Sequence, residues 1–204
     1  MNQQEQSLKA LQDIRQIMDR SNRFISLSGW SGVAAGICAI IGAFCAHHYI
    51  DLYQLPNAGL SAYELERILM LIAVLTFAAA FALSFGFTFI RSRKEGIPVW
   101  GAIAKRLLFN TMVPLLVGGL VAYRLLELEQ YGLIAPLCLL FYGLALINGS
   151  KYTLGEIKYL GYFLLVLGSF CLWIPGYGLY FWTLGFGVLH IIYGAVMWWK
   201  YERK

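Results

Sequence analysis

The chain has 204 residues, of which 59% are hydrophobic and 13% are charged. Soluble domains carry about 25% charged residues, so this composition excludes a soluble globular domain and indicates an integral membrane protein with lipid around it. The net charge of +5 lies mostly in short loops between apolar segments, where it orients helices, and it does not indicate a nucleic-acid partner.

Residues 1–23 form a polar leader with one apolar stripe, which predicts a cytoplasmic amphipathic helix. The leader is too long and too acidic for the first region of a signal peptide. Its acidic and basic residues nearly balance, which favours a protein partner over an anionic lipid surface. The predicted contact residues are Leu8, Leu11, Ile14 and Met18, with Ile17 on the same stripe.

Six apolar segments follow within residues 24–200, and residues 201–204 form a tail. A spanning helix needs about 20 residues, and the fourth and fifth segments are the short ones. The pattern predicts an all-α polytopic transmembrane helix bundle of about six spans. The segments are 25–46, 68–90, 107–126, 133–148, 157–174 and 178–199.

The basic residues lie almost entirely on one side of this arrangement. Of the 16 Lys and Arg residues, all except Arg67 and Arg124 fall in the leader, the second and fourth loops, or the tail. The positive-inside rule then places both termini in the cytoplasm. An odd number of spans would mix the two sides, so the charges favour an even number independently of hydropathy.

Local patterns predict how the helices begin and pack. The outer loop over 50–67 ends with Ser61 and Glu64 at capping-box spacing, and Arg124 and Glu127 are spaced to form a pair on one helix. Small residues at helical spacing predict close packing within the chain or in a homo-oligomer. These are Ser28, Gly32 and Gly36; Ala78, Ala82 and Gly86; and Thr183, Gly187 and Ala195.

His190 is the only histidine near the middle of a predicted span. An ionisable residue at that depth is a functional-site hypothesis; the alternative is a neutral histidine bonded to a nearby hydroxyl or carbonyl. Because no Asp or Glu lies inside any predicted span, proton relays and ion-coupled carriers are disfavoured. The candidate intramembrane polar site is His190, Tyr193, Asn110, Tyr142 and Asn148.

Pro114 interrupts the third predicted span and frees the carbonyl of Asn110, four residues earlier. Gly118 and Gly119 follow on the same helix. The pattern predicts a hinge or a cavity-lining kink, as in transporters; a static kink in a packed bundle is the alternative.

His47, His48 and Asp51 cluster at the outer end of the first span. With Glu64, Glu66, Glu127 or Glu129 they would form a metal site of mixed nitrogen and oxygen ligands, but adjacent histidines point in different directions on a helix, so a polar rim is the preferred interpretation. No cofactor is predicted, because a bis-histidine haem would need a second histidine at mid-depth. The cysteines, which lack CxxC spacing, are Cys38, Cys45, Cys138 and Cys171.

Three stretches resemble a family of bacterial six-span integral membrane proteins whose activity is uncharacterised. They are ISLSGWSGVAAGICAIIGA (25–43), INGSKYTLGEIKYLGY (147–162) and GFGVLHIIYGAVMWWKYE (185–202), together with the leader. The last hairpin, with glycines around Pro175, also resembles HdeD-type acid-resistance membrane proteins. These resemblances imply a bacterial inner-membrane location but transfer no functional residue.

The features together favour a non-enzymatic bundle that binds, senses or anchors, with the leader as its contact to a cytoplasmic protein. The alternative is a small-molecule permease that uses the Pro114 kink and His190. A membrane enzyme acting on lipid or quinone ranks last, because the sequence offers no nucleophile–base pair.

Overall fold

The computed structural model describes residues 27–56, 59–96 and 100–203, which form helices and connections without a strand. The all-α prediction is therefore confirmed for this part of the chain. The predicted leader helix over 1–23, with its stripe of Leu8, Leu11, Ile14 and Met18, lies outside the described residues.

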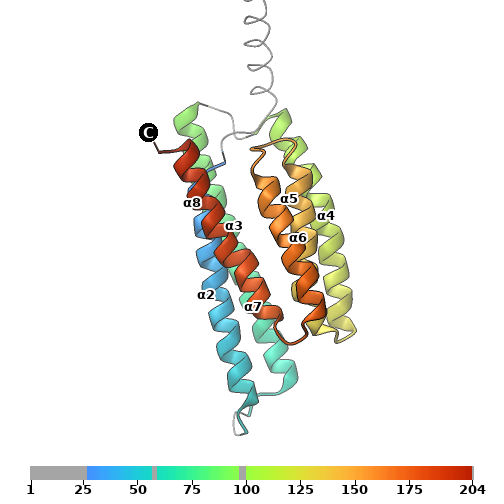
Figure 1. Ribbon diagram of the computed structural model, residues 1–204. Helices are drawn as coiled ribbons and strands as arrows, with labels where there is room; N and C mark the ends of the chain where they lie inside the picture. The colour runs from blue at the N-terminus through green and yellow to red at the C-terminus, as the bar shows by residue number, and fades with distance from the viewer. Residues whose placement is uncertain (1–26, 57–58, 97–99, 204) are drawn as a thin grey trace, which may run out of the picture.

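The helices run up and down the bundle in alternating directions (Figure 1). A 3-10 turn, η1, leads into α5, and a π-helical segment, η2, joins α7 to α8. The elements are α2 (Gly29–Gln54), α3 (Ala62–Glu95), α4 (Ala102–Glu127), η1 (Tyr131–Leu133), α5 (Ile134–Gly149), α6 (Ile157–Trp173), α7 (Gly178–Trp182), η2 (Thr183–Val188) and α8 (Leu189–Tyr201).

Five helical stretches in the described part of the chain are long and apolar enough to cross a membrane: α2, α3, α4, η1 with α5, and α7 through α8. The sixth apolar helix, α6, has 17 residues and is shorter. The predicted outer loop over 50–67 was too long. The helices continue to Gln54 and resume at Ala62, so the connection covers only 55–61.

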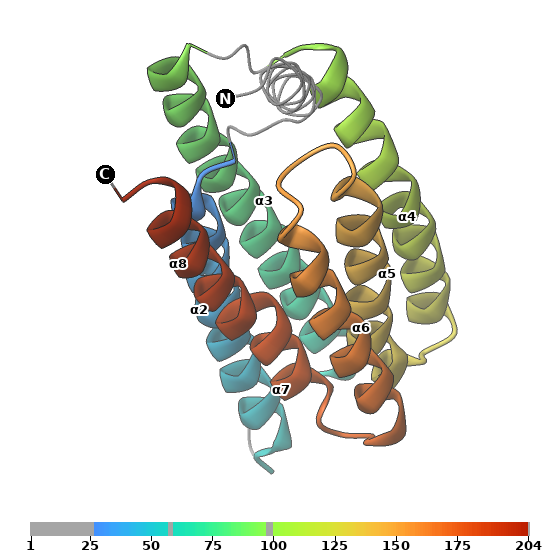
Figure 2. The ribbon, with the colours of Figure 1, turned by 45° about the horizontal axis from the view of Figure 1, so that its top comes forward.

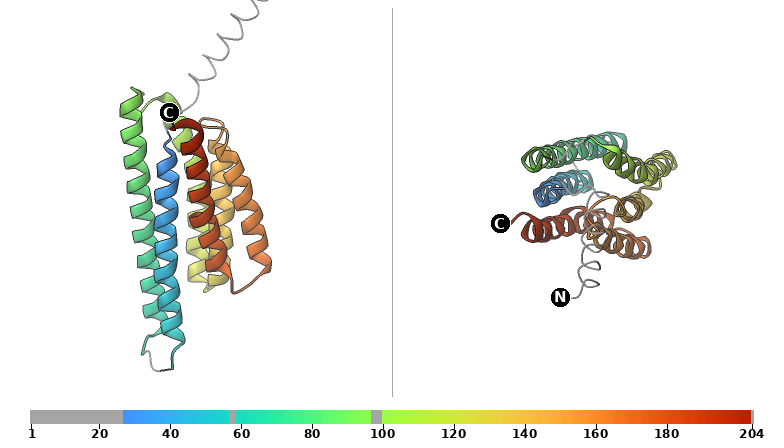
Figure 3. Two further views of the ribbon diagram at one scale, coloured as in Figure 1. Left: turned by 60° about the vertical axis from the view of Figure 1, so that its left-hand side comes forward. Right: turned by 90° about the horizontal axis from the view of Figure 1, so that it is seen from above.

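The capping box that starts α3 is confirmed. The Ser61 hydroxyl accepts a hydrogen bond from the Glu64 N–H at 3.2 Å, and the Glu64 carboxylate accepts one from the Ser61 N–H at 2.8 Å. With 34 residues, α3 is about 51 Å long at 1.5 Å per residue. The α2–α3 pair accordingly reaches beyond the other helices at one end (Figure 3).

The helices form two groups (Figures 2 and 3). In one group α2 lies between α3 and α8, and in the other α5 lies between α4 and α6. The segment α7–η2 contacts α5 and α6 as well as α8, and η2 also contacts α2, so it joins the groups. We call the end where α2 begins and α8 ends the C-terminal end of the bundle, and the other the opposite end.

Glycines bring α2 and α8 into backbone contact. A Cβ atom at Gly194 would lie 2.5 Å from the Gly29 carbonyl oxygen, and one at Gly36 would lie 2.6 Å from the Gly187 carbonyl oxygen. Gly32, Gly36 and Gly187 were predicted to lie on packing faces and do so, although the sequence did not identify the helices that meet; Gly29 and Gly194 lie at this contact where the predicted stripes had Ser28 and Ala195. Two helical turns take 7.2 residues, so residues seven apart align better along the contact than residues eight apart.

The small residues of α3 do not pack against the described part of the chain, and the alternative that they pack in a homo-oligomer stays a prediction. Ala78 and Ala82 are exposed, and Gly86 has open space around it. Hydroxyl side chains face α2 instead, and Ser84 donates a hydrogen bond to the Ser31 carbonyl at 3.0 Å. Lipid offers no hydrogen-bond partner, so hydroxyls turn inward and apolar rings turn outward. The outward rings, stacked with centroids 6.3 Å apart, are Phe77, Phe81, Phe85 and Phe89.

A cluster of buried leucine side chains lies where α5 and α6 meet. Leu139, Leu146, Leu160 and Leu164 form this core, and side chains of α7, η2 and α8 pack against it. A Cβ at Gly161 would lie 2.8 Å from the Gly143 carbonyl oxygen, so α5 and α6 also approach closely. This core forms the wall on which the candidate site rests.

Candidate functional site

His190 is buried, with 6% of its surface exposed, and both ring nitrogens have partners. Nδ1 lies 2.9 Å from the Gly185 carbonyl oxygen, which can only accept, so Nδ1 carries the ring proton. Nε2, 3.1 Å from the Tyr142 hydroxyl, therefore accepts a hydrogen bond from that hydroxyl. This geometry is the neutral, hydrogen-bonded histidine that the sequence offered as the alternative to a functional residue.

The carbonyl that holds His190 belongs to the π-helical segment η2, which the sequence did not predict. In this segment the Leu189 N–H donates to the Leu184 carbonyl, five residues earlier. Such segments inside α-helices occur frequently at functional sites. The sequence signal is the pair of glycines on either side of Phe186, Gly185 and Gly187.

Aromatic rings surround the histidine. The Tyr142 ring lies 5.4 Å from the His190 ring and 5.1 Å from the Phe186 ring, between centroids. Phe186 also stacks on His190 at 5.9 Å. These contacts hold the Tyr142–His190 pair in one orientation.

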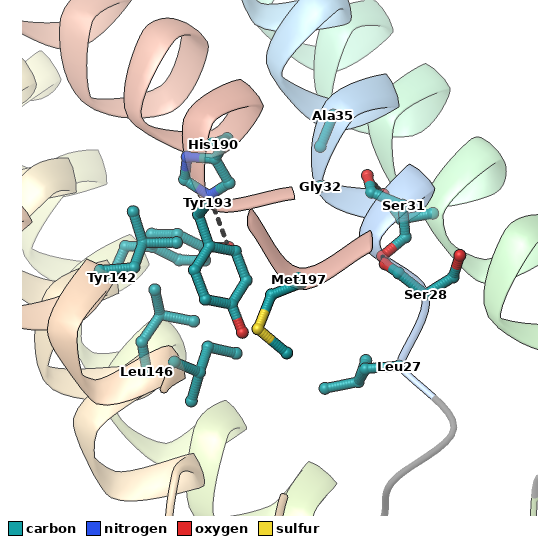
Figure 4. A pocket seen from close by; sticks show the side chains of 13 residues that line it. Leu27, Ser28, Ser31, Gly32, Ala35, Tyr142, Leu146, His190, Tyr193 and Met197 are labelled. Carbon is teal, nitrogen blue, oxygen red and sulfur yellow. Dashed lines mark hydrogen bonds between the residues drawn. The ribbon is translucent and has the colours of Figure 1, made fainter. Parts of the chain in front are cut away.

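A cavity of about 190 Å³ opens beside this pair (Figure 4). It extends from His190, in the middle of the bundle, toward Leu27 and Ile157 at the C-terminal end. The first turns of α2 and the side chains of α5, α6 and α8 line it. Ser84 of α3 also lines it, and the polar lining side chains are Ser28, Ser31, Ser84, Tyr142, His190 and Tyr193.

Most hydroxyl groups of the cavity wall already donate a hydrogen bond. Tyr142 donates to His190, Ser31 donates to the Ser28 carbonyl at 2.5 Å, and Ser28 and Ser84 also have acceptors. The Tyr193 hydroxyl has no hydrogen-bond partner among the described residues. In Figure 4 it points toward Met197 across the cavity. Tyr193 therefore presents an unused donor to the cavity.

A charged cluster lies beneath the cavity at the C-terminal end. Glu202 accepts hydrogen bonds from the Gly29 N–H at 2.5 Å, the Ser28 hydroxyl at 3.2 Å and Arg91 Nη1 at 2.9 Å. Arg91 also donates to the Leu27 carbonyl at 2.5 Å. Sequence reasoning missed this cluster. A signal was present, because the first turn of α2 has no acidic residue and its N–H groups favour a negative charge.

Asn110 and Asn148 lie apart from His190, at the contact of α4 with α5. The Asn148 amide donates to the Asn110 carbonyl at 2.8 Å, which is the carbonyl freed by Pro114. The Asn110 side chain instead donates to the Arg106 carbonyl at 2.8 Å. The predicted five-residue site therefore divides into His190, Tyr142 and Tyr193 at the cavity, and Asn110 with Asn148 elsewhere.

The structure holds α4 against α5 on both sides of Pro114. α4 runs unbroken through the proline, and a Cβ at Gly118 would lie 2.6 Å from the Phe141 side chain of α5. Gly119 has open space. These contacts suit a static helix, and a hinge at Pro114, Gly118 and Gly119 stays a prediction.

The proposed outer metal ligands do not assemble. His47 Nδ1 lies 3.7 Å from Asp51 Oδ1, and the His47 ring packs against Tyr180. Within the described ranges, no three His, Cys, Asp or Glu side chains gather where they could hold an ion. The other candidate ligands have partners of their own. His48 packs edge-on against Tyr49, Glu64 accepts from the Ser61 hydroxyl, and Glu66 accepts from the Tyr131 hydroxyl. Glu127 forms the predicted ion pair with Arg124 at 2.8 Å.

In comparisons with known proteins, no family model, no curated protein and no solved structure matches the chain. The resemblances drawn from the sequence therefore stay predictions.

Proposed function

We propose that the chain is a bacterial inner-membrane protein of six spans, with the C-terminal end of the bundle in the cytoplasm. The 17 residues of α6 give a helix of about 26 Å, close to the roughly 30 Å hydrocarbon thickness of a bilayer. Basic residues gather at the C-terminal end, which the positive-inside rule places in the cytoplasm. They are Arg91, Arg93, Lys94, Lys105, Arg106, Lys151, Lys158, Lys200 and Arg203.

Reporter fusions test this topology. Fusions in the connections at 96 and 152 should report the cytoplasm, and fusions at 58, 129 and 176 should report the outside. The same report from 152 and 176 would mean that α6 does not cross, and it would contradict the six-span arrangement.

Within this topology, the protein acts as a non-enzymatic bundle that binds a ligand and contacts a cytoplasmic protein through residues 1–23. The cavity carries this proposal. Its wall includes Leu27 and Ser28, which come four and five residues after the end of the leader in the chain. A ligand there would touch the point at which the leader joins the bundle, so occupancy can alter how the leader is presented.

The site chemistry supports binding over catalysis. The Nδ1–H of His190 donates to the Gly185 carbonyl, and Nε2 accepts a hydrogen bond from the Tyr142 hydroxyl. The lone pair of Nε2 is therefore already engaged and is not free to take a proton from a substrate. No carboxylate lines the cavity within the described residues. The lining also lies between mid-bundle and the C-terminal end, whereas a permease needs access to both sides of the membrane.

Deletion of residues 2–22 tests the partner contact. The full chain, purified from native membranes in mild detergent, should retain a stoichiometric soluble partner detectable by mass spectrometry. The deletion should lose the partner while still inserting into the membrane. Full function in the deletion variant would contradict the proposal.

A matched pair of leader variants separates the apolar stripe from the charges. Replacing Leu8, Leu11 and Ile14 with Ala should release the partner, because these side chains form the predicted contact. Replacing Lys9 and Arg15 with Ala should retain it. The reverse pattern would indicate that the leader binds an anionic surface instead.

A further inference from the structure

We propose that the cavity binds a small uncharged molecule, about the size of a substituted benzene, through a hydroxyl or carbonyl oxygen that accepts a hydrogen bond from Tyr193. This inference rests on the proposed binding function and names its ligand class.

The volume sets the size of the ligand. The cavity measures about 190 Å³, and an engineered protein cavity of about 150 Å³ takes up benzene. One planar ring with a short substituent fits, whereas a drug-sized molecule usually needs a pocket of about 300 Å³ or more. A second ring would require the walls to move.

The walls exclude a charged ligand. Among the described residues, the side chains that line the cavity carry no formal charge. Arg91 lies beyond Ser28 and is already paired with two carboxylates, Glu202 at 2.9 Å and Glu95 at 2.8 Å. A charged molecule would lose its hydration without gaining an opposite charge, which costs several kcal/mol in order of magnitude.

The polar groups set the position of the ligand oxygen. Tyr193 offers the unused O–H, so the ligand must supply an acceptor near Met197. The Tyr142 oxygen donates to His190 and keeps a lone pair that can accept from a ligand hydroxyl. Tyr142, His190 and Tyr193 contribute ring atoms to the cavity wall, and contacts between aromatic rings favour aromatic molecules beyond simple burial.

The experiment uses fluorine NMR on the full chain in lipid nanodiscs, with 4-fluorophenol as the probe. Fluorobenzene is the matched apolar probe, 4-fluorobenzoate is the charged one, and empty nanodiscs give the background from lipid partitioning. We expect saturable binding of 4-fluorophenol and no saturable binding of 4-fluorobenzoate.

Two variants assign the site. Tyr193→Phe keeps the ring and removes the hydrogen-bond donor. It should weaken the affinity for 4-fluorophenol about fivefold to tenfold, which corresponds to the loss of one neutral hydrogen bond, and leave the affinity for fluorobenzene unchanged. Ala35→Leu places a side chain in the cavity and should abolish binding of both. Ala79→Leu, on the exposed face of α3, is the control and should change neither.

Absence of saturable binding by either neutral probe would mean that water fills the cavity and would overturn the proposal. Binding of 4-fluorophenol with equal affinity by the wild type and Tyr193→Phe would overturn the ligand class, as would preferred binding of 4-fluorobenzoate. These outcomes are separate from the partner experiment. Failure to recover a leader-dependent partner, together with normal probe binding, would defeat the proposed function alone.

Discussion

Asn148 supplies the hydrogen bond that Pro114 removes from α4. In an uninterrupted helix, the N–H of residue 114 would donate to the Asn110 carbonyl, but proline has no N–H. Asn148 reaches from α5 and donates to that carbonyl at 2.8 Å. Replacing Asn148 with Ala should therefore leave a carbonyl unpaired at a helix contact inside the membrane.

The expected loss of stability is about 1 kcal/mol. Hydrogen bonds between membrane helices contribute about 0.6 kcal/mol on average and up to about 1.7 kcal/mol, and an unsatisfied buried carbonyl costs about 1–3 kcal/mol. Asn148 is partly buried, which favours a value at the low end of the region where the two ranges overlap. A loss of this size changes the unfolding equilibrium about fivefold.

The test is a double-mutant cycle by reversible unfolding in mixed micelles. Pro114→Ala restores the N–H, so Asn148→Ala should cost almost nothing in that background, and the coupling energy should be about 1 kcal/mol. Asn110→Ala keeps the carbonyl and loses only a side chain that bonds within its own helix, so it should unfold like the wild type. Equal losses from Asn148→Ala with and without Pro114 would refute the reasoning.

Three further predictions concern the helix contacts. Gly194→Ala should lower the free energy of unfolding by about 1–3 kcal/mol, because the added Cβ would overlap a carbonyl oxygen of α2. Gly119→Ala is the control and should leave the free energy of unfolding unchanged, because Gly119 has open space around it. Equal effects of the two substitutions would contradict the close contact. Glu202→Ala removes the acceptor for the first N–H of α2 and for Arg91, so it should lower the free energy of unfolding by about 2 kcal/mol. Glu202→Gln keeps an acceptor oxygen and should lower the free energy of unfolding by less. The opposite order would contradict the capping role. Burial acts to raise the pKa of the Glu156 carboxyl, but hydrogen bonds from Lys200 and the following tyrosine outweigh it, so the pKa is lowered. Its contribution to stability should be complete above the ordinary glutamate pKa of about 4.3 and disappear as the pH falls through the lowered pKa; a constant difference in unfolding between wild type and Glu156→Gln from about pH 6 to pH 3 would contradict this account.

Local rules of the backbone made several features predictable from the sequence. The Ser61–Glu64 capping box and the Arg124–Glu127 pair depend on spacings of three residues and form as expected. The freed carbonyl of Asn110 follows from proline chemistry alone. Hydropathy identified the helices themselves, although the ends of α2 and α3 extend further than their apolar residues because polar interface residues can continue a helix.

Features that depend on which helices meet were not predictable. The partner of the Asn110 carbonyl is on α5, and nothing in α4 identifies it. The small residues of α3 suggested a packing face, but that helix turns hydroxyls toward α2 and rings toward lipid. The π-helical segment that places His190 against Tyr142 departs from regular helix periodicity, so a pattern based on 3.6 residues per turn cannot reveal it.

Coupling between the cavity and the leader is tested by measuring how much of the soluble partner a cavity-filled variant retains. Ala35→Leu and the lipid-facing control Ala79→Leu would be purified in parallel with the wild type, and the retained soluble partner quantified by mass spectrometry. The account predicts that Ala35→Leu changes the amount of partner retained while Ala79→Leu matches the wild type. Equal recovery from all three proteins, with the cavity shown to be filled, would contradict it.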